Sequence, residues 1–191
     1  KWNLYPDGVL PLWVADMDFP ISKHVKAALL ERLESNLGYP FMTGDPQLMD
    51  VLIKKQLEYG LTDLEPKNLW LVSSVVPGLY AAVQGLTQAG DEIITQTPIY
   101  PPFLTSITDH GRVALQNPMV FHQSGWQIDF EQLETLVSPK TKVFMLCNPH
   151  NPTGRLFDAD ELDAVASVAR EHDLIVISDE VWEHLLMDGQ A

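Results

Sequence analysis

The chain has 191 residues, of which 46% are hydrophobic, and this proportion is sufficient for a folded core. Its 26 acidic residues outnumber the 12 basic ones and give a net charge of −14, which argues against nucleic acid and anionic membranes as partners. The longest apolar stretches have the length of strands, so we expect no transmembrane helix, and a single cysteine, Cys147, rules out an internal disulfide and predicts a cytoplasmic location.

The first part of the chain predicts an arm followed by two helices. Residues 2–20 are rich in aromatic and apolar side chains but have no helical period, so we expect an extended segment that packs on a surface. Ser22 is suited to cap an amphipathic helix. After a polar turn, Pro46 suits the first turn of a second helix, which we expect to end near Gly60.

The remainder of the chain alternates short apolar, β-branched runs with segments of helical period. This alternation predicts βαβ units with right-handed crossovers, and therefore an α/β fold with a largely parallel sheet. The predicted strands are residues 69–72, 92–96, 112–115, 143–147 and 174–177. The predicted helices are residues 75–86, 101–110, 129–137 and 158–172, the last with Asp158 and Glu161 as a capping box.

Polar motifs follow two of the predicted strands at the edge where open α/β sheets bind ligands. Residues 148–154 read NPHNPTG, and residues 178–180 read SDE. Asn151 can donate and accept hydrogen bonds between two prolines that fix the loop, and Asp179 closes an apolar strand, so its carboxylate needs a cationic or hydrogen-bonding partner. These residues alone leave open that Asn151 braces a turn and that Asp179 caps the next element.

The NPHNPTG motif at this distance from SDE resembles the fold-type I pyridoxal phosphate (PLP) enzymes, the aspartate aminotransferase superfamily. The resemblance implies a three-layer α/β/α large domain, here residues 46–191, and an N-terminal arm with part of a small domain, here residues 1–45. It implies PLP as the cofactor, with Asn151 bonded to its phenolic oxygen and Asp179 paired with its protonated pyridine nitrogen. A protonated ring is a better electron sink, so the pairing is chemically coherent.

The resemblance assigns further cofactor-binding residues. Prolines fix the segment around Tyr100, and the family's equivalent tyrosine covers the PLP ring. The resemblance places the phosphate on N–H groups of Ser74, Val75 and Val76, where a strand, a polar turn and a helix start would form an anion site. Tyr39 corresponds to a residue that reaches the phosphate of the neighbouring subunit's cofactor, which implies a homodimer with a shared active site.

Two segments bear on the substrate. Residues 12–20 read LWVADMDFP and resemble the N-terminal signature of the cystathionine β-lyase-like, or C–S lyase, branch of the superfamily. In that branch the backbone near Ala15 and Asp16 meets the substrate carboxylate. Trp182 stands where many relatives carry Tyr or His, and because Trp has one donor and no acceptor we expect it to line the pocket.

The resemblance also implies a lysine that forms a Schiff base with PLP beyond Asp179. No lysine follows Asp179 in this sequence, so we assign no catalytic residue, and the resemblance covers the N-terminal half of a family member. We predict no metal site, and we expect Cys147, at the end of a buried strand, to be a core residue and not a nucleophile.

We therefore predict a C–S β-lyase that acts on cystathionine-like or S-substituted cysteine amino acids and releases pyruvate, ammonia and a thiol. A class I/II aminotransferase is the first alternative, because the DEVWEH segment at residues 179–184 leans towards that branch. A non-catalytic binding or regulatory module with a PLP-enzyme fold is the second. A dinucleotide-binding domain ranks below these, since no GxGxxG follows any predicted strand.

Overall fold

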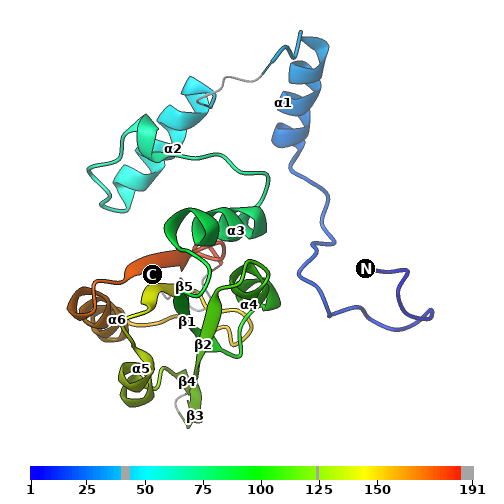
Figure 1. Cartoon of the computed structure of the whole chain (residues 1–191). Helices are drawn as coiled ribbons and strands as arrows, with labels where there is room; N and C mark the ends of the chain where they lie inside the picture. Colours follow the sequence, from blue (N-terminus) through cyan, green and yellow to red (C-terminus); the bar gives the residue numbers. More distant parts are fainter. Residues whose placement is uncertain (40–43, 124, 186–191) are drawn as a thin grey trace. The chain divides into compact units, whose positions relative to one another are not determined.

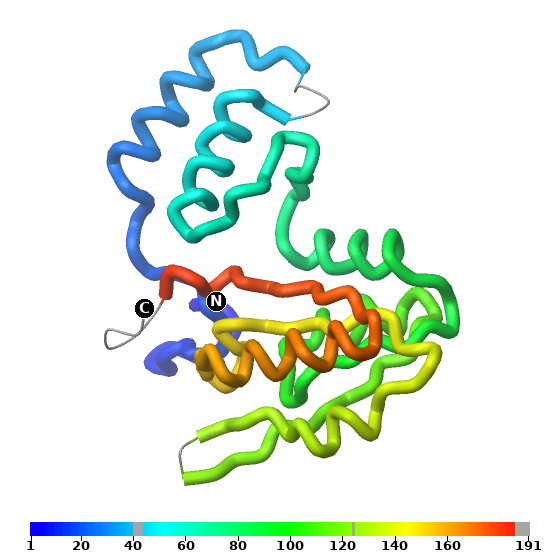
Figure 2. The backbone as a smooth tube through the Cα atoms, turned by 90° about the vertical axis from the view of Figure 1, so that its left-hand side faces the viewer, coloured from blue at the N-terminus to red at the C-terminus, as the bar shows by residue number. Residues whose placement is uncertain are grey.

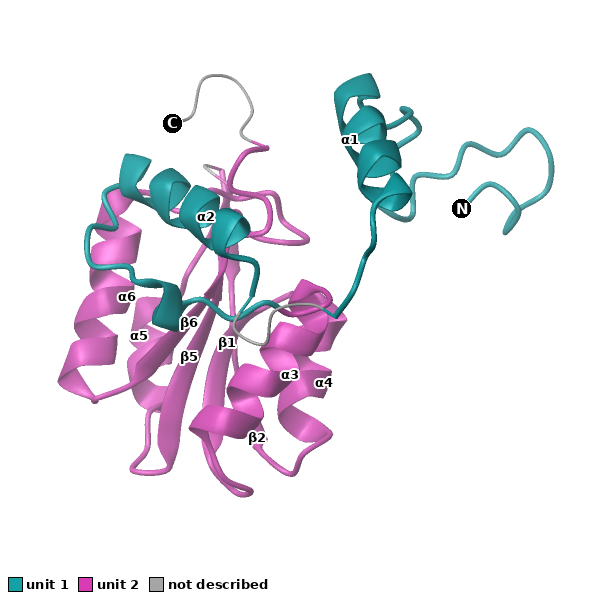
Figure 3. Cartoon of the chain, turned by 90° about the horizontal axis from the view of Figure 1, so that it is seen from above, with its two compact units in different colours: residues 1–71 teal, residues 72–191 magenta. Residues whose placement is uncertain are grey.

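The computed structural model describes residues 1–39, 44–123 and 125–185 (Figure 1). The chain divides into two compact units, residues 1–71 and residues 72–191 (Figure 3). The domain boundary that we predict between residues 45 and 46 stays a prediction. Within the described residues, no helix combines the length and the apolar composition that a membrane span requires.

The first unit contains the predicted arm and two α-helices. The arm has no regular secondary structure, and helix α1 (Lys23–Glu34), helix α2 (Pro46–Glu58) and the short 3₁₀ helix η1 (Pro66–Asn68) follow it. The predicted cap of α1 is confirmed, because the Ser22 side chain accepts a hydrogen bond from the N–H of His24. Helix α1 nevertheless buries none of its residues.

The second unit is built on a four-stranded parallel sheet. Its strands are β1 (Glu92–Thr97), β2 (Val113–Pro118), β5 (Thr141–Cys147) and β6 (Ile175–Asp179), in the order β2-β1-β5-β6. All three pairings in this sheet are parallel, which confirms the prediction. Each crossover contains a helix, and Figure 2 follows one from β5 in yellow through α6 in orange to β6 in red-orange.

Helices cover both faces of this sheet, so the three-layer α/β/α architecture is confirmed (Figure 3). Helices α3 (Val75–Leu86) and α4 (Pro101–Thr108) pack on one face, and α5 (Phe130–Leu136) and α6 (Ala159–Glu171) pack on the other. Alternate strand residues point to opposite faces, which divides the apolar side chains into two cores. The α3–α4 core holds Leu79, Val83, Phe103, Ile107, Ile93, Val143, Met145 and Cys147 among others, and the α5–α6 core holds Leu133, Val165, Val168, Ile94, Phe144 and Leu146.

Two elements differ from the sequence prediction. Residues 69–72 do not form the predicted strand, because a strand requires a hydrogen-bonded neighbour and none of the described strands pairs with this segment. The stretch after β2, for which the sequence predicts neither strand nor helix, contains a short antiparallel pair, β3 (Val120–His122) and β4 (Gly125–Gln127). Three residues per strand are too few to give a readable alternation in the sequence.

Candidate functional site

Backbone hydrogen bonds gather three of the predicted site residues at the carboxyl edge of the sheet. The N–H of Tyr100, just after β1, donates to the carbonyl oxygen of Asn151 at 3.2 Å. The N–H of Asn148, just after β5, donates to the carbonyl oxygen of Asp179 at 3.0 Å. The loops after β1 and β5 and the end of β6 are therefore joined, and Tyr100, Asn151 and Asp179 lie at one edge of the sheet.

Asp179 is a buried carboxylate at this edge. It is 9% exposed, and its Oδ1 accepts a hydrogen bond from the N–H of Val181 at 3.0 Å. It lies opposite Cys147 in the β5–β6 register, on the face that α3 and α4 cover. No lysine, arginine or histidine among the described residues forms an ion pair with it. A carboxylate at this depth is stabilised by a cation or by further hydrogen bonds, which a ligand bound at this edge can supply.

Cys147 lies beside this carboxylate but has the properties of a core residue. It is 2% exposed, and its Sγ is 3.5 Å from the carbonyl oxygen of Pro149. Burial raises the pKa of the Cys147 thiol to about 11, and the negative charge of Asp179 acts in the same direction. The thiol is therefore protonated at neutral pH, as expected for a residue that is not a nucleophile.

The loop that carries Asn151 is closed by its own backbone. The N–H of His150 donates to the carbonyl oxygen of Arg155 at 2.7 Å, and the N–H of Gly154 donates to that of His150 at 2.7 Å. The side-chain oxygen of Asn148 accepts from the N–H of Phe157 at 3.0 Å. Asn151 is thus presented from a loop whose two ends are bonded to each other.

His150 is the buried side chain of this loop, and the sequence pattern predicts no role for it. It is 2% exposed, its Nδ1 lies 2.9 Å from the Oγ1 of Thr153, and its ring packs edge-on against Phe157. Burial lowers the pKa of His150 to about 4, so the imidazole is neutral at physiological pH. The available signal was its position between the two Asn-Pro pairs of the loop.

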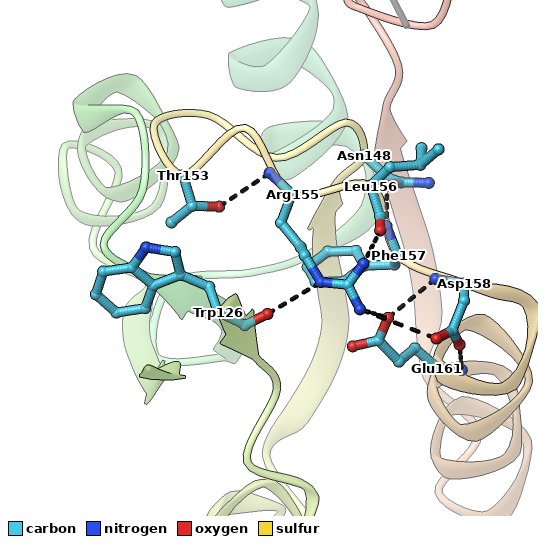
Figure 4. Close-up of polar contacts among 8 residues, drawn as sticks. All are labelled: Trp126, Asn148, Thr153, Arg155, Leu156, Phe157, Asp158 and Glu161. Carbon is cyan, nitrogen blue, oxygen red and sulfur yellow. Dashed lines mark hydrogen bonds and ion pairs between the residues drawn. The ribbon is translucent and has the colours of Figure 1, made fainter. Parts of the chain in front are cut away.

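Arg155 is the second residue that the sequence analysis missed, and it ends the loop (Figure 4). Its Nε donates to the carbonyl oxygen of Trp126 in β4 at 3.0 Å. Its Nη2 lies 2.6 Å from the Oε2 of Glu161 in α6, and its Nη1 donates to the carbonyl oxygen of Leu156. Its position directly after the motif, three residues before the predicted cap at Asp158, was the signal that could have found it.

The start of α3 belongs to the same edge of the sheet. The last turn of α3 lines a surface pocket together with Asp91 and Lys142, which lie at the amino ends of β1 and β5. The helix therefore runs antiparallel to the strands, and its first turn lies at their carboxyl ends. Ser74, its N-cap, makes no side-chain capping hydrogen bond, and the N–H groups of Val75 and Val76 precede the first intrahelical bond of the helix. Free N–H groups at a helix start suit an anion.

The remaining predicted site residues are not brought to this edge by any described contact. Ala15, Asp16 and Tyr39 belong to the first unit, where the carbonyl oxygen of Asp16 accepts from the Lys1 ammonium and the Tyr39 side chain is fully exposed. Trp182 is half-buried in the turn after β6. Their roles stay predictions. Within the described ranges, no cluster of histidine, cysteine and acidic side chains is arranged to hold a metal ion.

Comparison with known proteins decides the family. The profile described as "Aminotransferase class I and II" matches residues 7–191. The chain belongs to this family. Members of the aminotransferase class I and II family include PLP-dependent lyases as well as aminotransferases.

Individual relatives point to the C–S lyase branch of the family. Cystathionine beta-lyase PatB of Bacillus subtilis is 36% identical over 181 residues, which cover 94% of this chain and 46% of that protein. The structure of cystalysin from Treponema denticola, which contains a pyridoxal 5'-phosphate cofactor, matches 97% of this chain and 47% of that one, with 31% identity and a TM-score of 0.85. A PLP-bound C–S lyase from Staphylococcus hominis matches 88% and 43%, with 30% identity and a TM-score of 0.81. The chain spans about half the length of the curated relatives it matches.

Proposed function

We propose that this chain is the cofactor-binding part of a PLP-dependent C–S β-lyase. The observation that carries the proposal is the buried carboxylate of Asp179, a residue whose backbone carbonyl oxygen accepts a hydrogen bond from the loop that presents Asn151. The N-terminal LWVADMDFP segment and the named lyases among the relatives support this branch of the family. We propose cystathionine-like or S-substituted cysteine amino acids as substrates, a cytoplasmic location, and a homodimer as the assembly.

The residues at the sheet edge fit PLP on physical grounds. The Asp179 carboxylate would hold the proton on the pyridine nitrogen, and the Asn151 amide would donate to the phenolic oxygen. The Tyr100 side chain is 43% exposed, which leaves its ring open to stack on a flat heterocycle. When bound, PLP supplies the electron sink for the charge that develops at the substrate α-carbon.

The phosphate and the substrate complete the proposed site. We propose that backbone groups of Ser74, Val75 and Val76 bind the phosphate, since the first turn of α3 has free N–H donors and no side-chain cap. Tyr39 would reach the phosphate of the partner subunit's cofactor. Ala15 and Asp16 would meet the substrate carboxylate through their backbone.

Trp182 and the lysine that anchors PLP are the remaining parts of the proposed site. The half-buried Trp182 would line the substrate pocket. We assign the lysine that anchors PLP in this family to no residue of these 191.

The reaction is tested with the longest gene product that contains this sequence. The lyase proposal expects pyruvate from cystathionine or an S-alkyl-cysteine when no keto-acid acceptor is present. Strict dependence of turnover on a keto acid would instead establish the aminotransferase alternative, which the turn segment with Trp182 favours. Binding of PLP with neither reaction would establish the non-catalytic module. A lysine in an S-x-x-K-type segment beyond Ala191 in the gene sequence would support the lyase and aminotransferase hypotheses. Its absence would argue against both.

A further inference from the structure

We propose that Arg155 is a positioning residue that holds Asn151 in place for the cofactor. Its side chain fastens the base of the loop of residues 148–155 to helix α6 and to strand β4. The Asn151 amide is thereby fixed where it can donate to the phenolic oxygen of PLP. This inference rests on the proposed function, because it names the residue that sets one contact of the same site.

The first step is the closure of the loop at Arg155. The N–H of His150 donates to the carbonyl oxygen of Arg155, so the residues before and after Asn151 are joined through the Arg155 backbone. Inside this closure the N–H of Arg155 lies 3.4 Å from the Oγ1 of Thr153, the same oxygen that contacts His150. Any displacement of the Arg155 backbone therefore moves the segment that carries Asn151.

The second step is the attachment of the Arg155 side chain in two directions (Figure 4). The Nε bond to Trp126 ties it to β4, and the Nη2 contact with Glu161 ties it to α6. The side chains of Arg155 and Glu161 are 25% and 13% exposed, so the ion pair is largely shielded from water. Shielded, hydrogen-bonded pairs of this kind are stronger than exposed surface pairs, and the planar guanidinium holds both partners at once.

The third step is the coupling of this attachment to the start of α6. The Oε2 of Glu161 accepts from Arg155 and also from the N–H of Asp158 at 2.9 Å, while the Oδ1 of Asp158 accepts from the N–H of Glu161 at 2.9 Å. The capping box of α6 and the loop anchor are therefore one network. Helix α6 packs on the sheet through Val165, Val168 and Ala169, so the loop is attached to a helix that is itself held by the core of the unit.

The test measures how strongly the site prefers PLP to 3-deoxypyridoxal 5'-phosphate, which lacks the phenolic oxygen. Dissociation constants for both compounds are obtained from tryptophan fluorescence of the 191-residue chain. The wild-type preference is expected to be about tenfold or more, the range of a hydrogen bond to a charged oxygen. Asn151→Ala is expected to remove the preference, and Arg155→Met to reduce it to about two- to threefold.

Matched variants separate positioning from general damage. Glu161→Gln is expected to lower the preference in the same direction, and combining it with Arg155→Met is expected to add little, because both remove one contact. Arg155→Lys keeps the positive charge but lacks the planar guanidinium that holds two partners at once. Its preference for PLP is expected to lie between those of wild type and Arg155→Met. Arg170→Met makes the same change on the exposed side of α6, where Arg170 contacts Ser167, and is expected to leave the preference unchanged. A wild-type preference in Arg155→Met overturns the inference.

A second measurement tests, without the cofactor, whether Arg155 holds the loop in place. Amide hydrogen exchange in the peptide of residues 148–157 is expected to be about tenfold faster in Arg155→Met and unchanged in Arg170→Met. Should the wild-type chain fail to bind PLP, the proposed cofactor-binding role of these 191 residues is lost, and the exchange rates alone decide whether Arg155 anchors the loop. Equal exchange in Arg155→Met and wild type overturns it. If Arg155→Met does not fold, Arg155→Lys and Glu161→Gln give the same two readouts.

Discussion

The loop of residues 148–155 and the first turn of α3 lie at the same edge of the sheet but differ in how their polar groups are satisfied. In the loop, backbone and side-chain groups are bonded to the protein through His150, Gly154 and Arg155. In α3, the Ser74 side chain caps nothing, and two N–H groups precede the first helical bond. The protein thus preorganises the end proposed for the PLP ring and leaves donors for a ligand at the end proposed for the phosphate.

The largest expected effect is at the preorganised end. Asp179→Asn is expected to weaken PLP binding by about a hundredfold to a thousandfold, or about 3–4 kcal/mol, because it removes the charged partner of a buried pair. The matched control is Glu180→Gln, the next residue, which is exposed and contacts Ser178. It is expected to change affinity by less than about twofold, since an exposed charge is screened. Equal losses in the two variants would show that burial does not distinguish these carboxylates.

The next effect concerns the stability of the same loop and depends on pH. The pKa of His150 is lowered to about 4 in the folded chain by burial, whereas the unfolded value is 6.5. Between these values His150 binds a proton in the unfolded state but not in the folded state. The stability that the neutral, buried His150 contributes is therefore complete above pH 6.5 and is lost as pH falls towards 4. We expect a loss of about 2–3 kcal/mol across this window.

Urea unfolding at several pH values measures this effect against His150→Asn. The asparagine keeps a group that can bond Thr153 but does not titrate. The difference in unfolding free energy between wild type and variant is expected to shrink as pH falls from 6.5 to 4. A difference that does not change with pH would mean that His150 is as accessible to protons as an exposed histidine.

A smaller effect is expected at the first turn of α3, where the N–H groups are free. Val75→Pro removes one N–H at the first position of α3, where proline is tolerated, and the extended backbone of Ser74 suits a following proline. PLP binding is expected to fall about fivefold, or about 1 kcal/mol, through loss of one donor to the phosphate. Pyridoxal, which has no phosphate, serves as the ligand control and Val75→Ala as the variant control. A similar loss for pyridoxal would place the phosphate elsewhere.

Cys147, beneath the preorganised loop, is expected to be the least reactive group of this region. Because burial raises its pKa to about 11, the folded chain is expected to react with Ellman's reagent at pH 8 far more slowly than the urea-unfolded chain. The measurement is the ratio of the two rates. Rapid reaction of the folded chain would indicate that the core under Asp179 opens readily.

Much of this fold could be predicted because its signals are local. Apolar, β-branched runs identified β1, β5 and β6, and the pair Asp158 and Glu161 identified the start of α6. The strand expected at residues 69–72 was wrong because pairing depends on a neighbour that the segment itself does not specify. The first unit gives the same lesson, since the periodicity of α1 predicted its helix, while its apolar face remains exposed.

The residues of the candidate site also differ in how far the sequence alone identifies them. Asn151 and Asp179 could be singled out because a motif and a strand end mark them. His150 and Arg155 were marked only by their places within and directly after the motif. Their importance arises from burial against Phe157 and from contacts with Trp126 and Glu161, which lie 29 and 6 residues away in sequence from Arg155. Residues that support a site through the folded chain leave little trace in the sequence around them.

The parallel register of β5 and β6 determines which way the acid of the site faces. Cys147 lies opposite Asp179, which turns the carboxylate towards the face that α3 and α4 cover. A slip of one residue would turn it to the α6 face, and a slip of two would carry it about 7 Å along the strand. An insertion or deletion in the short turn after α6, around Asp173, therefore threatens chemistry at the far end of the strand without altering any residue there.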